Sequence, residues 1–189
     1  MAENADTSAS AASNGDGSSP LAASAGSARD NGAPRPAWQG RVDFYILEGA
    51  SSSARLKLAC KLAEKAYLAS QSVLVWHTDP AELRSLDDML WTFSDSSFVP
   101  HDVLPSSGAR GDIPVLLSPG VMPSANANTD IIINLAAELP ACLSQTRRVV
   151  EIIDGDDARR RAGRARFKAY RELGVQPASH NIRGDWRPD

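Results

Sequence analysis

The chain has 189 residues, with 20 Lys and Arg against 23 Asp and Glu, a formal charge of −3, and 42% hydrophobic residues. The hydrophobic content excludes a fully disordered chain, and the charge excludes a histone-like protein that holds nucleic acid by bulk positive charge. No run of about 18 apolar residues is present, so we expect no membrane span. One domain with a tail, in the cytoplasm, is the simplest expectation.

Residues 1–40 differ in composition from the rest of the chain. Ala, Ser, Gly and Pro together make up 26 of these 40 residues. They offer too little apolar surface to offset the entropy cost of ordering, so we expect a disordered tail. A basic n-region with an apolar run is missing, so no secretory signal is predicted. The sequence then predicts a folded domain over 41–175 and a polar extension over 176–189 that frays beyond Gly174.

Strand and helix patterns alternate within the predicted domain. The expected strands are 42–47, 72–77, 115–117, 130–135 and 147–153, and the expected helices are about 51–70, 80–91 and 156–173. The serines at 51–53 are N-cap candidates for the first helix, and Asp79 followed by Pro80 opens the second. This alternation predicts a three-layer α/β fold, with a mostly parallel sheet and helices on both faces.

The turn after the first predicted strand resembles the position of a phosphate-binding loop. A Walker A motif needs two glycines and a Gly-Lys-Ser/Thr end, so that backbone N–H groups and the lysine can hold phosphates. Residues 48–55 read EGASSSAR, with one glycine and no Gly-Lys, and the chain contains no GxGxxG. The sequence therefore predicts no P-loop, and we do not expect nucleotide-dependent catalysis.

Histidines and cysteines form no catalytic or metal-binding pattern. His77 and His101 lie near predicted strand ends, each with an aspartate within two residues, but neither stands beside a nucleophile motif. We expect ordinary hydrogen-bonded histidines. Cys60 and Cys142 lack CxxC spacing and are expected to be reduced thiols. We accordingly predict no enzyme activity in this chain, no cofactor and no metal.

The last predicted helix has two contrasting faces when residues are placed at about 100° intervals. One face holds small residues and should press on the sheet. Its members are Ala158, Ala162, Ala165, Ala169 and Leu173. The opposite face is a basic stripe that contains an aromatic residue. Its members are Arg160, Arg164, Phe167, Lys168 and Arg171.

Arginines beside an aromatic ring suit a ligand that carries both a carboxylate and an apolar group, such as an acidic peptide. Single-stranded nucleic acid, with bases stacked on the ring, is the alternative ligand. Residues 41–189 carry 18 basic against 19 acidic residues, whereas nonspecific DNA binding relies on broad positive potential. We therefore favour the acidic peptide, and keep direct single-stranded DNA binding and a degenerate nucleotide-binding enzyme as alternatives.

Five motifs, in this order, resemble the chi subunit of bacterial DNA polymerase III. They are FYIL at 44–47, LDDMLW at 86–91, SFVPH at 97–101, GDIPV at 111–115 and RARFKAYR at 164–171. The resemblance implies a non-catalytic accessory protein of the replisome with a nucleotide-binding-like α/β fold. It also implies contact with DNA mainly through other proteins.

The resemblance further implies two binding surfaces. Chi proteins bind the C-terminal tail of single-stranded DNA-binding protein, in which acidic residues precede a proline and a terminal phenylalanine. They also pair with the psi subunit and so join the clamp loader. The motifs assign the tail site to Arg164, Phe167, Lys168 and Arg171, with Arg160 in a basic family position one turn earlier.

For the second surface, Trp91 and Phe98 match the aromatic residues that face psi in the family. The family often has tyrosine where Phe167 stands, so this chain lacks one hydroxyl group at the tail site.

Overall fold

The computed structural model describes residues 38–49, 51–94, 98–104, 112–120 and 129–183. Most of the predicted tail, and the motif residues at 97 and 111, lie outside these ranges. The elements are β1 (Arg41–Leu47), α1 (Ser52–Leu68), β2 (Val73–His77), α2 (Pro80–Thr92), β3 (His101–Val103), β4 (Val115–Pro119), β5 (Thr129–Asn134), η1 (Leu143–Gln145), β6 (Thr146–Ile153), α3 (Asp157–Glu172) and β7 (Ala178–Ile182).

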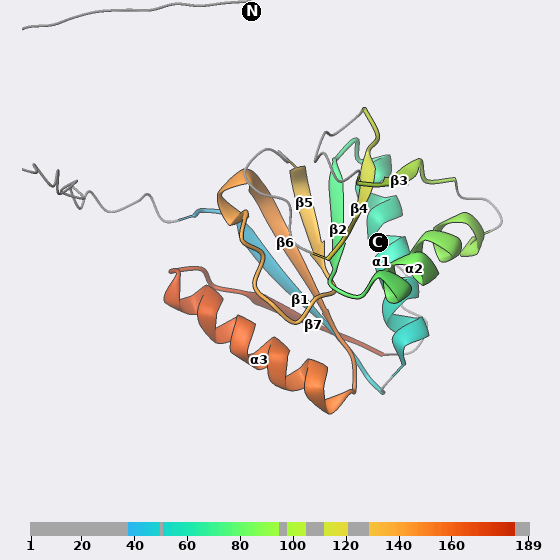
Figure 1. The fold of residues 1–189 in the computed structure, drawn as a ribbon. Helices are drawn as coiled ribbons and strands as arrows, with labels where there is room; N and C mark the ends of the chain where they lie inside the picture. Colours follow the sequence, from blue (N-terminus) through green and yellow to red (C-terminus); the bar gives the residue numbers. More distant parts are fainter. Residues whose placement is uncertain (1–37, 50, 95–97, 105–111, 121–128, 184–189) are drawn as a thin grey trace, which may run out of the picture. The chain divides into compact units, whose positions relative to one another are not determined.

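The described strands form one parallel sheet in the order β3-β4-β2-β5-β6-β1-β7. Helices α1 and α2 lie together beside it, and α3 lies apart from them (Figure 1). Successive side chains of a strand point to opposite faces of the sheet and so pack into two different hydrophobic cores. On β1, Tyr45 joins the core with α1 and α2, whereas Phe44 joins the core with α3. The predicted three-layer α/β fold is confirmed.

Two strands were not predicted. Strand β3 has only three residues, too few for an apolar pattern. Strand β7 follows Gly174, where we expected the chain to fray, and that expectation is wrong. β7 pairs in parallel with β1, with Ala178 opposite Asp43 and Ile182 opposite Leu47. The side chain of Ile182 is buried, and His180 lies 2.9 Å from the buried Asp43 carboxylate and stacks on Tyr45, so β7 is held to β1 by side chains as well as by the ladder.

Capping residues start each helix just after a strand. The Ser51 side chain accepts a hydrogen bond from the backbone of α1, and Asp79 does the same for α2, with Pro80 in the first position. Both caps were predicted. Asp156 caps α3, and Gly174, at a φ of +84°, follows its end. All three helix N-termini thus lie at the carboxyl edge of the sheet.

The two cysteines lie in different cores, Cys60 with α1 and Cys142 with α3. Both are buried free thiols, as predicted. Burial raises the pKa of the Cys60 thiol to about 12, which leaves it protonated and unreactive at neutral pH.

Helix α3 packs through a different face from the predicted one. Its buried residues are Gly163, Arg166 and Tyr170, whereas Ala158 and Ala165 of the small-residue face are exposed. At about 100° per residue, the buried face is turned by roughly 100° from the predicted face. The prediction is wrong because it ranked residues by size and polarity and gave no weight to a buried ion pair.

That ion pair centres on Glu151 of β6, which is completely buried. Its carboxylate accepts hydrogen bonds from Arg166 Nε at 2.9 Å, Tyr170 Oη at 2.8 Å and Asn134 Nδ2 at 3.0 Å. Arg166 also donates to the carbonyl of Ala137 at 2.7 Å. A buried carboxylate is costly without such partners, and two of them come from α3. Burial, together with this carboxylate, raises the pKa of Tyr170 far above its usual value.

Replacing Glu151 by alanine should therefore lower the free energy of unfolding by about 3–5 kcal/mol, because Arg166 would be left buried without its carboxylate. Urea denaturation followed by circular dichroism measures this change. The matched control is Glu138→Ala, which removes an exposed carboxylate and should stay within about 0.5 kcal/mol of wild type. Equal losses in the two variants would show that the ion pair does not hold α3.

Candidate functional site

A pocket of about 300 Å³ lies between α3 and the sheet near β1 and β7. Its lining combines apolar side chains with two arginines and one serine. The lining residues are Phe44, Ile46, Ile153, Arg160, Gly163, Arg164, Phe167 and Ser179. An apolar cavity bordered by cationic groups can accept an apolar side chain while the guanidinium groups bind a nearby carboxylate.

Gly163 keeps this pocket open. A Cβ atom at this position would lie 2.8 Å from Cδ1 of Ile153, which is closer than carbon atoms can approach without a shift. The absence of a side chain therefore lets α3 lie close to β6. It also leaves the space above Ile153 free for a ligand.

Phe167 forms part of the pocket wall, and its position corrects one prediction. We expected its ring on the exposed basic stripe, but the residue is half-buried and packs against the core. Its ring meets Phe44 edge to face, with centroids 5.2 Å apart and an interplanar angle of 61°. Phe44 in turn contacts Tyr170 at 6.2 Å. Phe167 is thus fixed by aromatic packing and still borders the pocket.

The structure brings together three of the five residues predicted to bind the acidic tail. Arg160, Arg164 and Phe167 line one pocket, whereas Lys168 and Arg171 lie outside its lining, exposed on the same helix. All four basic residues are exposed, as the stripe predicted.

The charges on this helix are not all equally available. Lys168 lies 3.6 Å from the carboxylate of Glu172, and both groups are exposed, so the pairing is weak. Arg160 Nε donates to the carbonyl of Asp154 at 3.3 Å. Arg164 and Arg171 make no ion pair with any other described residue. Of these two, only Arg164 lies at the pocket, which makes it the strongest candidate for binding a ligand carboxylate.

Sequence reasoning missed the sheet side of this pocket. Phe44, Ile46 and Ile153 looked like ordinary strand residues, and Ser179 lies on a strand that was not predicted. One signal was available, because a glycine inside a helix weakens it and often marks a close approach. Gly163, between Arg161 and Arg164, was that glycine.

Trp91 and Phe98 form an exposed aromatic surface, 56% and 63% exposed, with ring centroids 5.6 Å apart. The ring of His101 lies 4.7 Å from that of Trp91. The ring of His101 is oriented by the contact of its Nδ1 with the carbonyl of Val99 at 2.7 Å, whereas its Nε2, 3.3 Å from Asp87 Oδ1, makes no hydrogen bond to the described residues. Two adjacent exposed aromatic rings on a fixed support are typical of a protein interaction surface. The two residues predicted to face psi therefore lie together.

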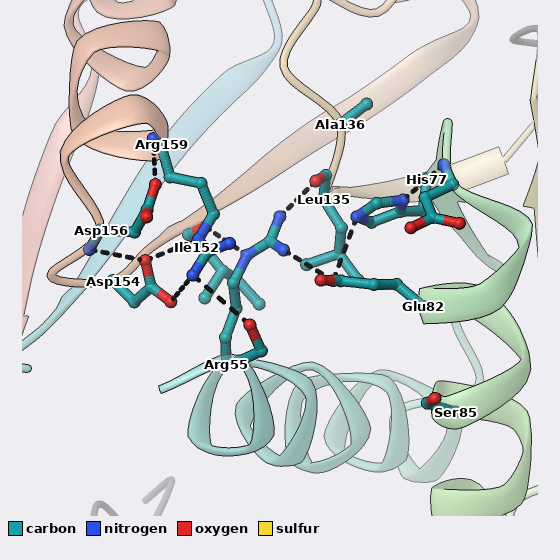
Figure 2. A network of polar contacts seen from close by, with 12 residues as sticks. Arg55, His77, Glu82, Ser85, Leu135, Ala136, Ile152, Asp154, Asp156 and Arg159 are labelled. Atoms are coloured by element: carbon teal, nitrogen blue, oxygen red, sulfur yellow. Dashed lines mark hydrogen bonds and ion pairs between the residues drawn. The ribbon is translucent and has the colours of Figure 1, made fainter. Parts of the chain in front are cut away.

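A second pocket, of about 220 Å³, lies near the carboxyl ends of β2, β5 and β6. Figure 2 shows the side chain of Arg55 extending from α1 into the network beside it. Arg55 is 3% exposed and donates to the carbonyls of Ile152 and Leu135. Its Nη1 lies 3.4 Å from Glu82 Oε2. The helix that would follow a P-loop thus inserts an arginine among the strand ends.

Arg159 and Asp154 form a tighter pair next to Arg55 (Figure 2). Arg159 Nε and Nη2 each lie 2.7 Å from one oxygen of the Asp154 carboxylate. Burial opposes ionisation of Asp154, but hydrogen bonds from Arg159 and from the backbone N–H of Asp156 outweigh it, so the pKa of Asp154 lies below its usual value. This pair fixes the first turn of α3 to the end of β6.

His77 lines the same pocket as a neutral, hydrogen-bonded residue. Its Nδ1 accepts the backbone N–H of Asp79 at 2.8 Å, so the proton is on Nε2, which faces Glu82 Oε2 at 3.3 Å. Burial and then the charge of Arg55 lower the pKa of His77. The structure therefore supports the prediction of an ordinary hydrogen-bonded histidine.

Within the described ranges, no three or more His, Cys, Asp or Glu side chains are grouped so that they could hold a metal ion. Among the helices in those ranges, none combines the length and the apolar character needed to cross a membrane.

Comparison with known proteins identifies the family. Residues 40–178 match the family described as DNA polymerase III chi subunit, HolC. The chain belongs to the DNA polymerase III chi subunit family. This confirms the resemblance drawn from the five motifs, and it places the chain among the proteins of DNA replication.

Two relatives named DNA polymerase III subunit chi support this membership. The protein from Pseudomonas aeruginosa is 37% identical over 142 residues, which cover 75% of this chain and 96% of the relative. The protein from Escherichia coli is 30% identical over 135 residues, covering 69% and 90% of the two chains.

Solved structures share the fold of this chi-family chain. T4 UvsW superposes with a TM-score of 0.55 at 10% identity, and S. cerevisiae Dbp5 bound to Gle1 with a TM-score of 0.51 at 9% identity. Each match covers 76% of this chain and 42% of the other chain. At such low identity the likeness shows the α/β fold alone.

The Asp154–Arg159 pair gives a pH-dependent prediction. The lowered pKa of Asp154 stabilises the fold above the ordinary value of about 4, and this contribution is lost as the pH falls through the folded-state pKa. Asp154→Asn should therefore be less stable than wild type at pH 7, and the difference should shrink toward pH 3. Urea denaturation at several pH values measures it. A difference that stays constant with pH would contradict the ion-pair explanation.

Proposed function

We propose that this chi-family chain is a non-catalytic accessory subunit of DNA polymerase III. In this proposal it binds the acidic C-terminal tail of single-stranded DNA-binding protein at α3 and links that protein to the clamp loader. The observation that carries the proposal is the apolar pocket bordered by Arg160 and Arg164. Family membership supports the replication role, and the pocket supports the kind of ligand.

The pocket suits the two chemical parts of such a tail. A terminal phenylalanine ring can enter the space bordered by Phe44, Ile153 and Phe167, where Gly163 adds no side chain. Its α-carboxylate and the preceding acidic side chains then lie near the guanidinium of Arg164 and the outer face of α3. Charge-assisted hydrogen bonds from arginine to carboxylate are among the strongest available to an exposed site.

Lys168 and Arg171 have a secondary role in this proposal. They lie outside the pocket lining, so they attract acidic residues of the tail that precede the phenylalanine. Because both are exposed, their contribution is long-range attraction that salt screens. Arg160 and Arg164, at the pocket, act at short range and fix the orientation of the bound end.

The exposed surface of Trp91 and Phe98 is proposed as the contact with psi, and through psi with the clamp loader. The two rings project from α2 and from the segment before β3. The pocket proposed for the tail, bordered by Arg160 and Arg164 (the tail pocket), is built by residues of α3, β1, β6 and β7. The two sites share no lining residue. One chain can therefore hold both partners at once, which is what a link between two assemblies requires.

For the tail site, Arg164→Ala should weaken binding of a tail peptide by about tenfold to a hundredfold, because a charge-assisted hydrogen bond contributes about 1.5–3 kcal/mol. Calorimetric titration of the full chain with the peptide measures this. Arg161→Ala is the matched control, since it removes another exposed arginine of α3 that does not line the pocket. Equal affinity of the two variants would contradict the proposed site.

The ligand class is tested in the same titration. A peptide without its terminal phenylalanine should lose most of its affinity, because it leaves the apolar pocket empty. A single-stranded oligonucleotide should bind weakly and lose its affinity steeply with salt. If the oligonucleotide bound more tightly than the peptide, direct nucleic-acid binding would replace the proposed function.

For the second surface, Trp91→Ala should weaken psi binding by about tenfold or more, since tryptophans that become buried on binding are frequent anchors of interfaces. It should leave tail-peptide binding unchanged. Leu68→Ala, which removes another exposed apolar side chain, is the control and should change neither affinity. Surface plasmon resonance with immobilised psi measures the effect. Unchanged psi binding by Trp91→Ala would move the psi contact elsewhere.

A further inference from the structure

The second pocket, at the carboxyl ends of β2, β5 and β6, has one carboxylate partner for each of its arginines, but the arginines are not equally well paired. Three arginines, Arg55, Arg159 and Arg166, line it. Arg159 and Arg166 are each paired at 2.7 Å, with Asp154 and with Glu151 respectively. Two of the three cations are therefore fully compensated by buried carboxylates.

Arg55 is the exception. Its carboxylate partner, Glu82, is 3.4 Å away, beyond the usual 2.7–2.9 Å of a charge-assisted hydrogen bond, and the same oxygen of Glu82 also faces His77. Three of the five N–H donors of a guanidinium have described acceptors here, which leaves two for a ligand. Burial lowers the pKa of Arg55 to about 10. This arginine is thus nearly completely buried and only weakly neutralised.

The position of the pocket favours a ligand. In parallel α/β sheets, ligands bind in the crevice beyond the carboxyl ends of the strands. The first turn of α2 contributes Glu82, and the first turns of α3 contribute Ala158 and Arg159, so two helix N-termini add partial positive charge. Among the described carboxylates that pair with these three arginines, Glu82 alone lacks a tight partner, and its side chain is 28% exposed. It can turn toward solvent when an anion enters.

We propose that this second pocket is a binding site for a small oxyanion, a phosphate or a carboxylate group. Arg55 is the main residue that binds the anion, and Arg159 lies beside it. A volume of about 220 Å³ admits such a group and a short attached chain, but not a whole dinucleotide. The site borders the tail pocket at Ile153, which lines both, but no arginine lines both pockets, and none of its lining residues belongs to the Trp91 surface. It does not depend on the function proposed for either.

NMR titration of the full 15N-labelled chain with inorganic phosphate tests the proposal, with acetate in a second arm and ADP in a third. The amides of Ala136 and Ala137 and the ring of His77, which line the pocket, should shift and saturate with phosphate or acetate. Tighter binding of ADP than of phosphate would identify a phosphate carried on a nucleotide. Equal binding would identify the free anion. Either result supports the site.

Three variants make the test specific. Arg55→Gln should weaken phosphate at least about tenfold, as expected when a charged hydrogen bond is lost. Glu82→Gln removes the competing carboxylate at a partly exposed position and should tighten phosphate several-fold. Arg161→Ala, on the exposed face of α3, should leave the affinity unchanged.

Shifts confined to the exposed arginines of α3 would overturn the proposal, because they would report general attraction to a basic surface. Unchanged phosphate affinity in Glu82→Gln would also overturn it. Circular dichroism shows whether Arg55→Gln folds. If it does not, the phosphate affinity of Glu82→Gln still tests the site.

Discussion

The buried carboxylate of Glu151 determines how the functional end of this protein is arranged. It is completely buried, and both Arg166 and Tyr170 of α3 bond to it. These contacts fix the rotation of α3 about its own axis. With that rotation set, Gly163 lies over Ile153 and Arg164 lies at the edge of the tail pocket. A helix rolled by even one residue step, about 100°, would point the same arginine elsewhere.

Three surfaces follow from one sheet and three helices. The tail pocket lies along α3 on the side of β1 and β7, the second pocket lies at the strand ends near Arg55, and the Trp91 surface lies on α2. The proposed link between two assemblies requires that the tail pocket and the Trp91 surface be separate, and the two share no residue. The rigid element between the two pockets is α3, which borders both through Arg159 on one side and Arg160 on the other.

Much of the fold follows from the sequence, because apolar strand runs and capping residues are local signals. Asp79 with Pro80 predicted the start of α2, and the family motifs assigned Arg164 and Phe167, which line one pocket, to the same predicted site. The rotation of α3 was not predictable in this way. Its alanines form the better hydrophobic stripe, and only the partner on β6 makes Arg166 a buried residue. Strand β7 was missed because it is polar and depends on the edge of β1. Arg55 was missed because its acceptors are backbone carbonyls far away in the sequence, Ile152 in β6 and Leu135 just after β5, and no local pattern indicates them.

The most direct test of this account is the position of a bound tail peptide. NMR of the labelled full chain with unlabelled peptide can record contacts of the terminal phenylalanine ring with methyl groups and aromatic rings of the protein. The account predicts contacts from that ring to the Cδ1 methyl of Ile153 and to the ring of Phe167. Contacts to residues around Trp91, or none near Ile153 at saturating peptide, would show that the tail binds elsewhere and that the pocket beside α3 is not its site.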